Sequence, residues 1–208
     1  MLKFLNTDLL SNLEVNNDYF PFFSSKQALK DSVNPAELVT SFPSINDGGS
    51  FPLQSVNLGT DLGLLIEELE GPVFKKLLEQ KFRVDLKNKH VVTTLRGYSR
   101  KKDGQIHTDS TSKIITVLLY LNTDWEDISG CLRLLKNSND LEDFIEEVPC
   151  SFGSMVAFKV TDNCWHGFAP YEGKRLSIQL NYIHPETFKI HSIRHRLSAF
   201  LKKFKVWF

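Results

Sequence analysis

The sequence has no excess charge of either sign, and this argues against one broad class of partner. Its 25 basic residues are balanced by 25 acidic ones over 208 positions, so no overall positive field is present to recruit nucleic acid. Long hydrophobic runs are missing too: nothing approaches the ~18 apolar residues of a membrane-spanning helix. Asn6 and Asp8 interrupt the N-terminus before the apolar core of a signal peptide forms. We therefore expect a soluble globular protein with no nucleic-acid partner.

Cysteine is also scarce, and the few thiols form no recognisable motif. Cys131, Cys150 and Cys164 are an odd number at unrelated spacings, without a C-x-x-C pair. This pattern argues against a zinc knuckle and against a thioredoxin-type redox motif. It fits a reducing compartment, so we expect a cytoplasmic protein.

No internal repeat, low-complexity tract or shift in composition divides the chain. Its length is that of one domain with a substantial core. Within this single domain, over residues 1–208, we expect three parts. They are a mostly helical support region over residues 1–89, a strand-rich core over 90–185 and a basic amphipathic helix over 186–208.

The first half of the chain gives mainly helical signals. Residues 62–70 predict a helix, and its apolar face is formed by Leu64, Leu65 and Leu69. Gly71-Pro72 then ends this helix and begins another, because proline is favoured in a first turn. Residues 25–33 indicate a further short helix, and residues 18–23 an edge strand, where Pro21 is tolerated.

After Lys89 the character changes to β-branched and aromatic runs separated by turn residues, which predict strands. These runs cover residues 91–99, 113–122, 131–135, 154–160 and 175–183. Helices followed by strands favour helices packed on one side of an antiparallel β-sandwich. The predicted fold class is therefore α+β and mainly β.

Three side chains have the types and spacing of an iron site. His107 and Asp109 are two residues apart, and on a β-strand such residues project to the same side. His166 would be brought to them by a distant strand. Two imidazoles and one carboxylate can occupy one face of an iron(II) ion and leave the other positions open.

Each of these residues also has a purely structural interpretation. His107 could bond to its strand neighbours, Asp109 could be a turn residue, and His166 could pack beside Trp165. Cys164 is not counted as a ligand, because a thiolate would favour softer metal chemistry and a buried cysteine acts as a small hydrophobe.

Arg175 begins a strictly alternating strand nine positions after His166. Its polar face contains Arg175, Ser177, Gln179 and Asn181. In a small barrel this face can line a ligand cavity while the apolar face packs under helices. An arginine buried there needs a carboxylate, which a dicarboxylic cosubstrate would provide.

The block from about residue 91 to 183 resembles the prolyl-4-hydroxylase-like branch of the iron(II)/2-oxoglutarate-dependent dioxygenases. The matching pieces are Tyr98, His107-Thr-Asp109, residues 117–125, Ser129-Gly-Cys-Leu-Arg133, His166 and Arg175. The family commonly has Gly-Gly where this chain has Ser129-Gly130, so the loop beside the substrate is expected to differ.

The resemblance implies a double-stranded β-helix, or jelly-roll, core with supporting N-terminal helices and a C-terminal helix. It also implies roles: His107, Asp109 and His166 bind iron, and Arg175 pairs with the distal carboxylate of 2-oxoglutarate. Tyr98 and Tyr120 match tyrosines that hydrogen-bond this cosubstrate, and Ser177 and Gln179 line the same face.

The expected function is hydroxylation of an aliphatic C–H bond with iron(II), 2-oxoglutarate and O2, with ascorbate as a candidate reductant. Succinate and carbon dioxide would be released. The substrate is expected to be a small molecule or a peptidyl residue. The alternatives are a catalytically inactive cupin-like binding module and a halogenase, which would need an open position where Asp109 binds.

The segment after His191 has no acidic residue and a stripe of apolar ones between its lysines and arginines. An amphipathic helix docked on the barrel or on a second subunit is the favoured interpretation. The alternative is an interfacial helix that contacts anionic lipid, with Trp207 and Phe208 as anchors.

Overall fold

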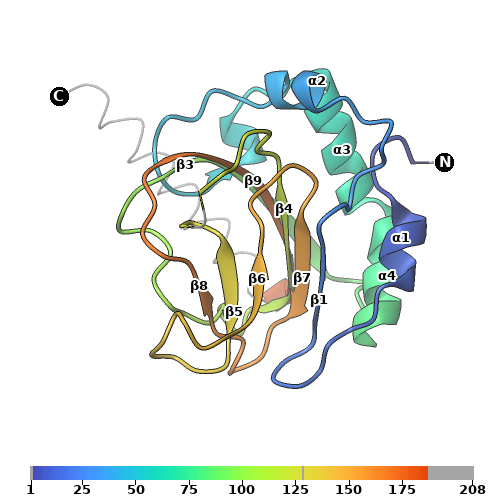
Figure 1. Ribbon diagram of the computed structural model, residues 1–208. Coiled ribbons are helices and arrows are strands. Elements are labelled where there is room, and N and C mark those ends of the chain that lie inside the picture. The colour runs from blue at the N-terminus through green and yellow to red at the C-terminus, as the bar shows by residue number, and fades with distance from the viewer. Residues whose placement is uncertain (1, 128, 187–208) are drawn as a thin grey trace.

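Two antiparallel β-sheets lie at the centre of the molecule, and helices cover the outer side of the larger one (Figure 1). The computed structural model describes residues 2–127 and 129–186. In spatial order, the six-stranded sheet contains β1 (Phe22–Ser25), β7 (Met155–Lys159), β4 (Lys113–Tyr120), β9 (Gly173–Ile183), β3 (His90–Ser99) and β2 (Phe51–Pro52). The three-stranded sheet contains β6 (Phe144–Val148), β5 (Leu132–Leu135) and β8 (His166–Gly167). This mainly β architecture agrees with the predicted jelly-roll.

The helices of the described residues all precede the main strands in sequence. They are α1 (Thr7–Asn12), α2 (Pro35–Thr40), α3 (Thr60–Glu70) and α4 (Pro72–Phe82), with a short 3-10 turn at Leu53–Ser55. None of these helices has the length and hydropathy that crossing a membrane requires. The predicted C-terminal helix lies outside the described residues, apart from its first position.

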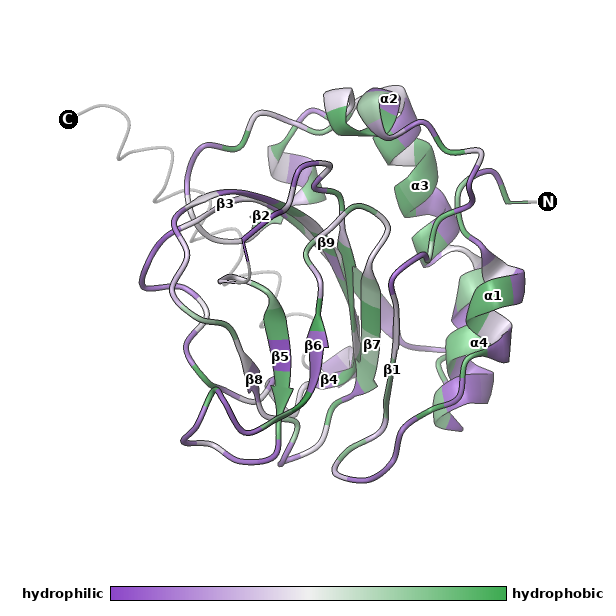
Figure 2. Cartoon of the chain, in the orientation of Figure 1, coloured by the Kyte–Doolittle hydropathy of each residue, from purple (hydrophilic) through white to green (hydrophobic). Residues whose placement is uncertain are grey.

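The central strand β9 has an apolar face that packs under the helices and a polar face on the other side. Leu176, Ile178, Leu180 and Tyr182 are buried in one hydrophobic core with residues of α3 and α4. The alternate residues of β9 face the smaller sheet instead. Hydrophobic residues on β5 and β7 and on the helices can be followed in Figure 2. The predicted alternation, with its apolar face under helices, is confirmed.

The helices α3 and α4 form where the sequence predicts, but the buried face of α3 is turned from the predicted one. Gly71 ends α3, and Pro72 occupies the first turn of α4. The core side of α3 consists of Leu62, Leu65, Ile66 and Leu69. Leu64 is 39% exposed, so placing it on the apolar face was wrong. Ile66 takes its place.

The short helix predicted over residues 25–33 does not form, because its backbone is used in pairing with other segments. The amide of Asn6 donates to the carbonyl of Ala28, and the amide of Ala28 donates to the carbonyl of Gly153. The helix in this region is α2, which begins one residue after Asn34. The Asn34 side chain caps it by accepting a hydrogen bond from the amide of Ala36.

The predicted edge strand exists but is shifted along the chain. Residues 18–23 were expected, whereas β1 covers Phe22–Ser25 and pairs with β7 at one edge of the six-stranded sheet. Phe22 also forms an isolated bridge with Asn16. Pro21 directly precedes it. The other five predicted strands appear as β3, β4, β5, β7 and β9, with ends shifted by at most two residues.

Candidate metal and cosubstrate site

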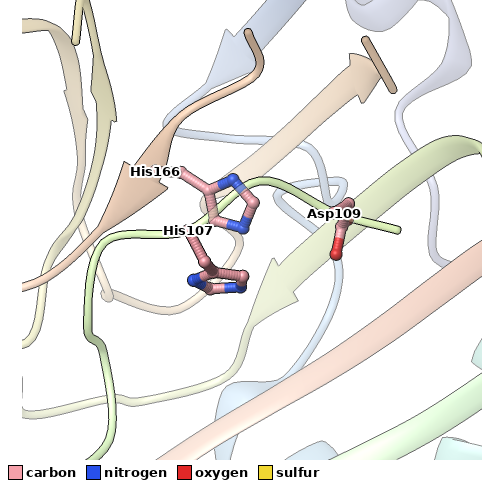
Figure 3. A group of neighbouring side chains, drawn as sticks. All are labelled: His107, Asp109 and His166. Carbon is pink, nitrogen blue, oxygen red and sulfur yellow. The ribbon is translucent and has the colours of Figure 1, made fainter. Parts of the chain in front are cut away.

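Two histidines and one aspartate meet at the open end between the two sheets. His166 lies on β8, and its backbone pairs with His107: each amide donates to the other residue's carbonyl, at 3.0 and 2.9 Å. One ligand atom from each of His107, Asp109 and His166 lies within 4.8 Å of the others. Figure 3 shows the two imidazoles facing the Asp109 carboxylate across a gap.

The segment that carries His107 and Asp109 differs from the prediction in one respect. A strand was expected there, but His107 forms only an isolated bridge, and Asp109 lies in irregular backbone. The two side chains converge because the chain turns toward β4 directly after them. The expectation that His166 comes from a distant strand is confirmed.

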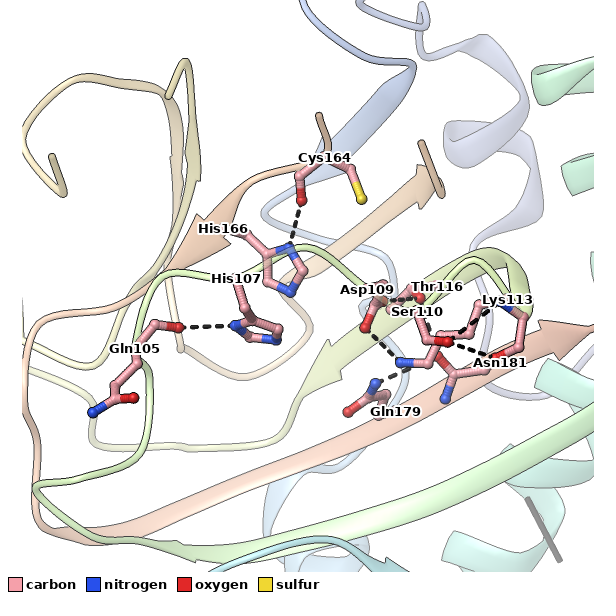
Figure 4. A network of polar contacts seen from close by, with 11 residues as sticks. Gln105, His107, Asp109, Ser110, Lys113, Thr116, Cys164, His166, Gln179 and Asn181 are labelled. Carbon is pink, nitrogen blue, oxygen red and sulfur yellow. Dashed lines mark hydrogen bonds and ion pairs between the residues drawn. The ribbon is translucent and has the colours of Figure 1, made fainter. Parts of the chain in front are cut away.

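Both imidazoles are held in the same way by backbone carbonyls. The Nδ1 atom of His107 lies 2.8 Å from the carbonyl oxygen of Gln105, and Nδ1 of His166 lies 2.8 Å from that of Cys164 (Figure 4). A carbonyl can only accept, so Nδ1 carries the proton in each ring. The lone pair of each Nε2 is then free to bind a metal ion.

Burial prepares His166 for this role. It lowers the pKa of His166 to about 4, and His107 contributes in the same direction, while Asp109 acts against them. His166 is therefore neutral at physiological pH. A neutral imidazole is the form that coordinates metals.

Both carboxylate oxygens of Asp109 have partners. Oδ1 lies 2.5 Å from Nζ of Lys113, and Oδ2 accepts a hydrogen bond from the hydroxyl of Thr116. Burial alone would raise the pKa of Asp109, but Lys113 and His166 outweigh it and lower this pKa. The carboxylate is thus ionised and oriented.

The guanidinium of Arg175 lies in the same cavity and is only 4% exposed. Its Nε donates to the carbonyl of Gly130 at 2.9 Å, and its Nη2 donates to the Tyr120 hydroxyl at 3.2 Å. It also stacks 4.3 Å from the ring centre of Phe168. No carboxylate of the described residues forms an ion pair with it. A buried charge without a counter-ion is costly, so this site calls for an anionic ligand.

These groups line one cavity of about 500 Å³ between the sheets. Of the residues predicted to contact the cosubstrate, Tyr120 and Gln179 line it. Tyr98 and Ser177 are not among its lining residues. The Ser177 hydroxyl is nevertheless buried on the same face of β9, between Arg175 and Gln179, and has no hydrogen-bond partner among the described residues.

Further polar residues line this cavity that were not predicted to be site residues. Among them are Arg96, Lys113, Thr116 and Asn181. Thr116 lies directly opposite Asn181 in the pairing of β4 with β9. Asn181 belongs to the polar face of β9 that the alternating sequence predicts. The sequence could therefore have identified Asn181 as a cavity residue. The contacts of Lys113 and Thr116 with Asp109 depend on a turn that the sequence does not specify.

The fold brings two histidines, a carboxylate and a buried arginine to one cavity, and this is the set of groups that a non-haem iron oxygenase needs. The sequence comparison agrees: residues 90–183 match the family model of the 2OG-Fe(II) oxygenase superfamily. Over those residues the chain is similar to that superfamily, and the solved structures that share its fold include prolyl hydroxylases. No curated protein sequence matches the chain.

Solved structures share the fold at low sequence identity. A Trichoplax adhaerens prolyl hydroxylase in complex with a hypoxia inducible factor peptide fragment has a TM-score of 0.59 and 19% identity, covering 88% of this chain and 93% of that one. A Pseudomonas putida prolyl-4-hydroxylase gives 0.54 and 16%, covering 86% and 89%. HygX from Streptomyces hygroscopicus, with nickel and 2-oxoglutarate bound, gives 0.55 and 10%, covering 81% and 84%.

Proposed function

We propose that the protein is an iron(II)- and 2-oxoglutarate-dependent hydroxylase of an aliphatic C–H bond. One observation carries this proposal: the three potential ligands and an arginine without a carboxylate partner open into one cavity. The donor set suits iron(II), since two neutral imidazoles and a carboxylate fill half of an octahedral shell. When bound, iron(II) and 2-oxoglutarate would supply the oxidising power of the reaction and release succinate and carbon dioxide.

The residues of the chain would divide the remaining tasks. The carbonyls of Gln105 and Cys164 fix the two imidazoles, while Lys113 and Thr116 fix the carboxylate. Such indirect contacts keep ligands in one geometry and so preserve the open coordination positions.

Arg175 would bind the distal carboxylate of 2-oxoglutarate. Its position is set by Gly130 and Tyr120, and the Tyr120 hydroxyl is available to the same carboxylate. The rings beside Arg175 keep the region dry, which strengthens a charge-assisted hydrogen bond.

The substrate class proposed is a small molecule or a peptidyl residue, and one neighbour with this fold is in complex with a peptide fragment. We also propose that the protein is located in the cytoplasm, since Cys131, Cys150 and Cys164 are all buried free thiols. A catalytically inactive binding module has no specific support, because all three ligands and the arginine are in place.

A direct test is the conversion of 2-oxoglutarate to succinate by the purified protein with iron(II) and oxygen. We expect slow conversion without added substrate, because this reaction needs only the cosubstrate and the triad. The matched controls are Asp109→Ala, which removes a ligand, and Asp162→Ala, which removes an exposed acid that does not line the cavity. Activity in the first control, or none in the wild type, would refute the proposed function.

A further inference from the structure

A second arginine in the cavity has no task in the proposed reaction. Arg96 lies on β3 and lines the same cavity as Arg175. Among the described residues it forms no ion pair and no side-chain hydrogen bond. A partly buried guanidinium without a partner is costly to the fold, so it points to a ligand that the chain itself does not supply.

Strand pairing places Arg96 on the inner side of the sheet. It lies opposite Ser177 of β9, and Ser177 lies opposite Tyr120 of β4, so the three residues form one row across the sheet. Neighbouring strands are about 4.8 Å apart, which separates the backbones of Arg96 and Tyr120 by about 10 Å. Arg175 contacts the Tyr120 side of this row. Arg96 occupies the other side.

Asp103, the acid that attracts Arg96, forms no ion pair or hydrogen bond with it; its carboxylate is held by Arg100 instead. Asp103 is bound by Arg100 through the backbone amide, Nε and Nη2, at 3.0, 3.2 and 2.9 Å. Burial lowers the pKa of Arg96 and repulsion from Arg175 lowers it further, while attraction to Asp103 acts in the opposite direction. An anion bound beside Arg96 would offset the cost of burial and the repulsion.

The charge of the cavity as a whole leads to the same conclusion. Its charged lining consists of four cations, Arg96, Lys102, Lys113 and Arg175, and two carboxylates, Asp103 and Asp109. Iron(II) and 2-oxoglutarate carry equal and opposite formal charges, so binding both leaves this positive excess unchanged. An excess of positive charge in a half-enclosed cavity attracts anions.

Arg96 and Arg175 lie at different depths in the cavity, and this gives them different tasks. Arg175 is almost fully buried, whereas Arg96 is partly exposed, and the cavity near its strand is also lined by Ser50 and the exposed Lys102. A cosubstrate that binds first and deep would use Arg175. A substrate that enters afterwards would meet Arg96 nearer the opening.

We propose that the primary substrate carries an oxyanion group, a carboxylate or a phosphate, and that Arg96 binds this group. The proposal rests on the proposed oxygenase function and narrows its substrate class. Arginine suits the task because its planar fork can donate two parallel hydrogen bonds to either kind of oxyanion.

The test measures binding of small probes to the full chain loaded with zinc(II) and saturating 2-oxoglutarate, so that no turnover occurs. The carboxylate pair is N-acetylglutamate and N-acetylglutamine, and the phosphate pair is glucose 6-phosphate and glucose. Ligand-detected NMR reports binding, and the Nε–H resonance of Arg96 reports contact. We expect at least tenfold preference for the acidic member of one pair, and that pair identifies the oxyanion.

Arg96→Gln should lose this preference at least tenfold, whereas Lys101→Gln should keep it, because Lys101 is exposed and does not line the cavity. Equal binding of acidic and neutral probes, or no binding of either acidic probe, would overturn the proposal. A large rise in the 2-oxoglutarate dissociation constant of Arg96→Gln would also overturn it, by assigning Arg96 to the cosubstrate. Failure of the proposed function looks different: no protein, wild type included, would then show metal-dependent binding of 2-oxoglutarate.

Discussion

At the scale of single residues, the site is built from charged groups whose partners are mostly within the chain. Asp109 has Lys113 and Thr116, and the imidazoles have backbone carbonyls. Arg175 and Arg96 differ, because neither forms an ion pair among the described residues, although Arg175 donates hydrogen bonds to Gly130 and Tyr120. In a cavity so well provided with hydrogen bonds, two arginines without acidic partners indicate where ligands bind.

The change Arg175→Ala should weaken 2-oxoglutarate binding by more than a hundredfold. Leaving a desolvated carboxylate without its partner costs about 3 kcal/mol or more, and each 1.4 kcal/mol is tenfold in affinity. Metal binding should be unchanged, because Arg175 does not contact the triad. Calorimetric titration of metal-loaded protein measures both. The exposed neighbour Lys174 provides the control in Lys174→Ala, and unchanged affinity in Arg175→Ala would exclude this anchor.

Acid should destabilise the metal-free protein through His166. Its pKa is about 4 in the folded state, against 6.5 ordinarily, so the unfolded chain binds the proton more readily. The contribution is complete above pH 6.5 and is lost as the pH falls toward 4. It amounts to about 3 kcal/mol at most.

Urea unfolding with a chelator present, repeated between pH 7 and pH 4, measures this loss. His166→Gln should flatten the curve over that interval, because the group that titrates is gone. Asp109 does not confuse the result, since its lowered pKa confines its own contribution to lower pH. An equally steep curve in the variant would assign the effect to other groups.

At the scale of elements, long periodic segments were predictable and short ones were not. The helix α3 and the strand β9 follow from repeated apolar spacing over eleven residues each. The two-residue strands β2 and β8 and the six-residue helices α1 and α2 lack such repeats. They form because tertiary pairing selects them.

The buried face of α3 shows why even a correct helix is incompletely predicted. Leu64, Leu65 and Ile66 follow one another, and periodicity alone does not decide which of these apolar residues points outward. The sheet decides it, because β9 lies beneath the helices and buries Leu65 and Ile66. The three candidate metal ligands could be picked out from the sequence for the opposite reason: metal binding restricts the residue types severely, and the structure brings these three side chains together.

Leu65→Ala should therefore destabilise the fold by about 2–5 kcal/mol, the usual cost of a cavity left by a fully buried leucine. Leu64→Ala, its exposed neighbour, should change the unfolding free energy by about 0.5 kcal/mol or less. Chemical denaturation of both variants measures the difference. Similar losses in the two would contradict the observed orientation of α3.

At the scale of the whole molecule, the two sheets and the helices have separate roles. The six-stranded sheet packs one face on the helices and turns the polar residues of β9 to the cavity, while β5 and β8 close the other side. The site is thus held between parts that are far apart in sequence, since His107 and Arg175 come from different ends of the core. Ligands that join these parts should stabilise the entire fold.

We expect the melting temperature of the full chain to rise when metal and 2-oxoglutarate are added together. A ligand at a hundred times its dissociation constant adds about 2.7 kcal/mol, which for a chain of this size corresponds to roughly 5–10 °C. Without metal, 2-oxoglutarate should stabilise much less, because Arg175 would hold only one of its ends. Differential scanning fluorimetry with manganese(II) under nitrogen separates these contributions.

The decisive result of that experiment is whether the stabilisation by 2-oxoglutarate depends on bound metal. Asp109→Ala should abolish the joint effect, since a site missing one of its three ligands holds the metal weakly and leaves the cosubstrate without its second anchor. Arg175→Ala should keep the shift caused by metal alone and lose the additional shift caused by 2-oxoglutarate. If 2-oxoglutarate stabilised the wild type equally with and without metal, the triad and Arg175 would not act on one ligand, and the cavity would have to be assigned to two independent sites.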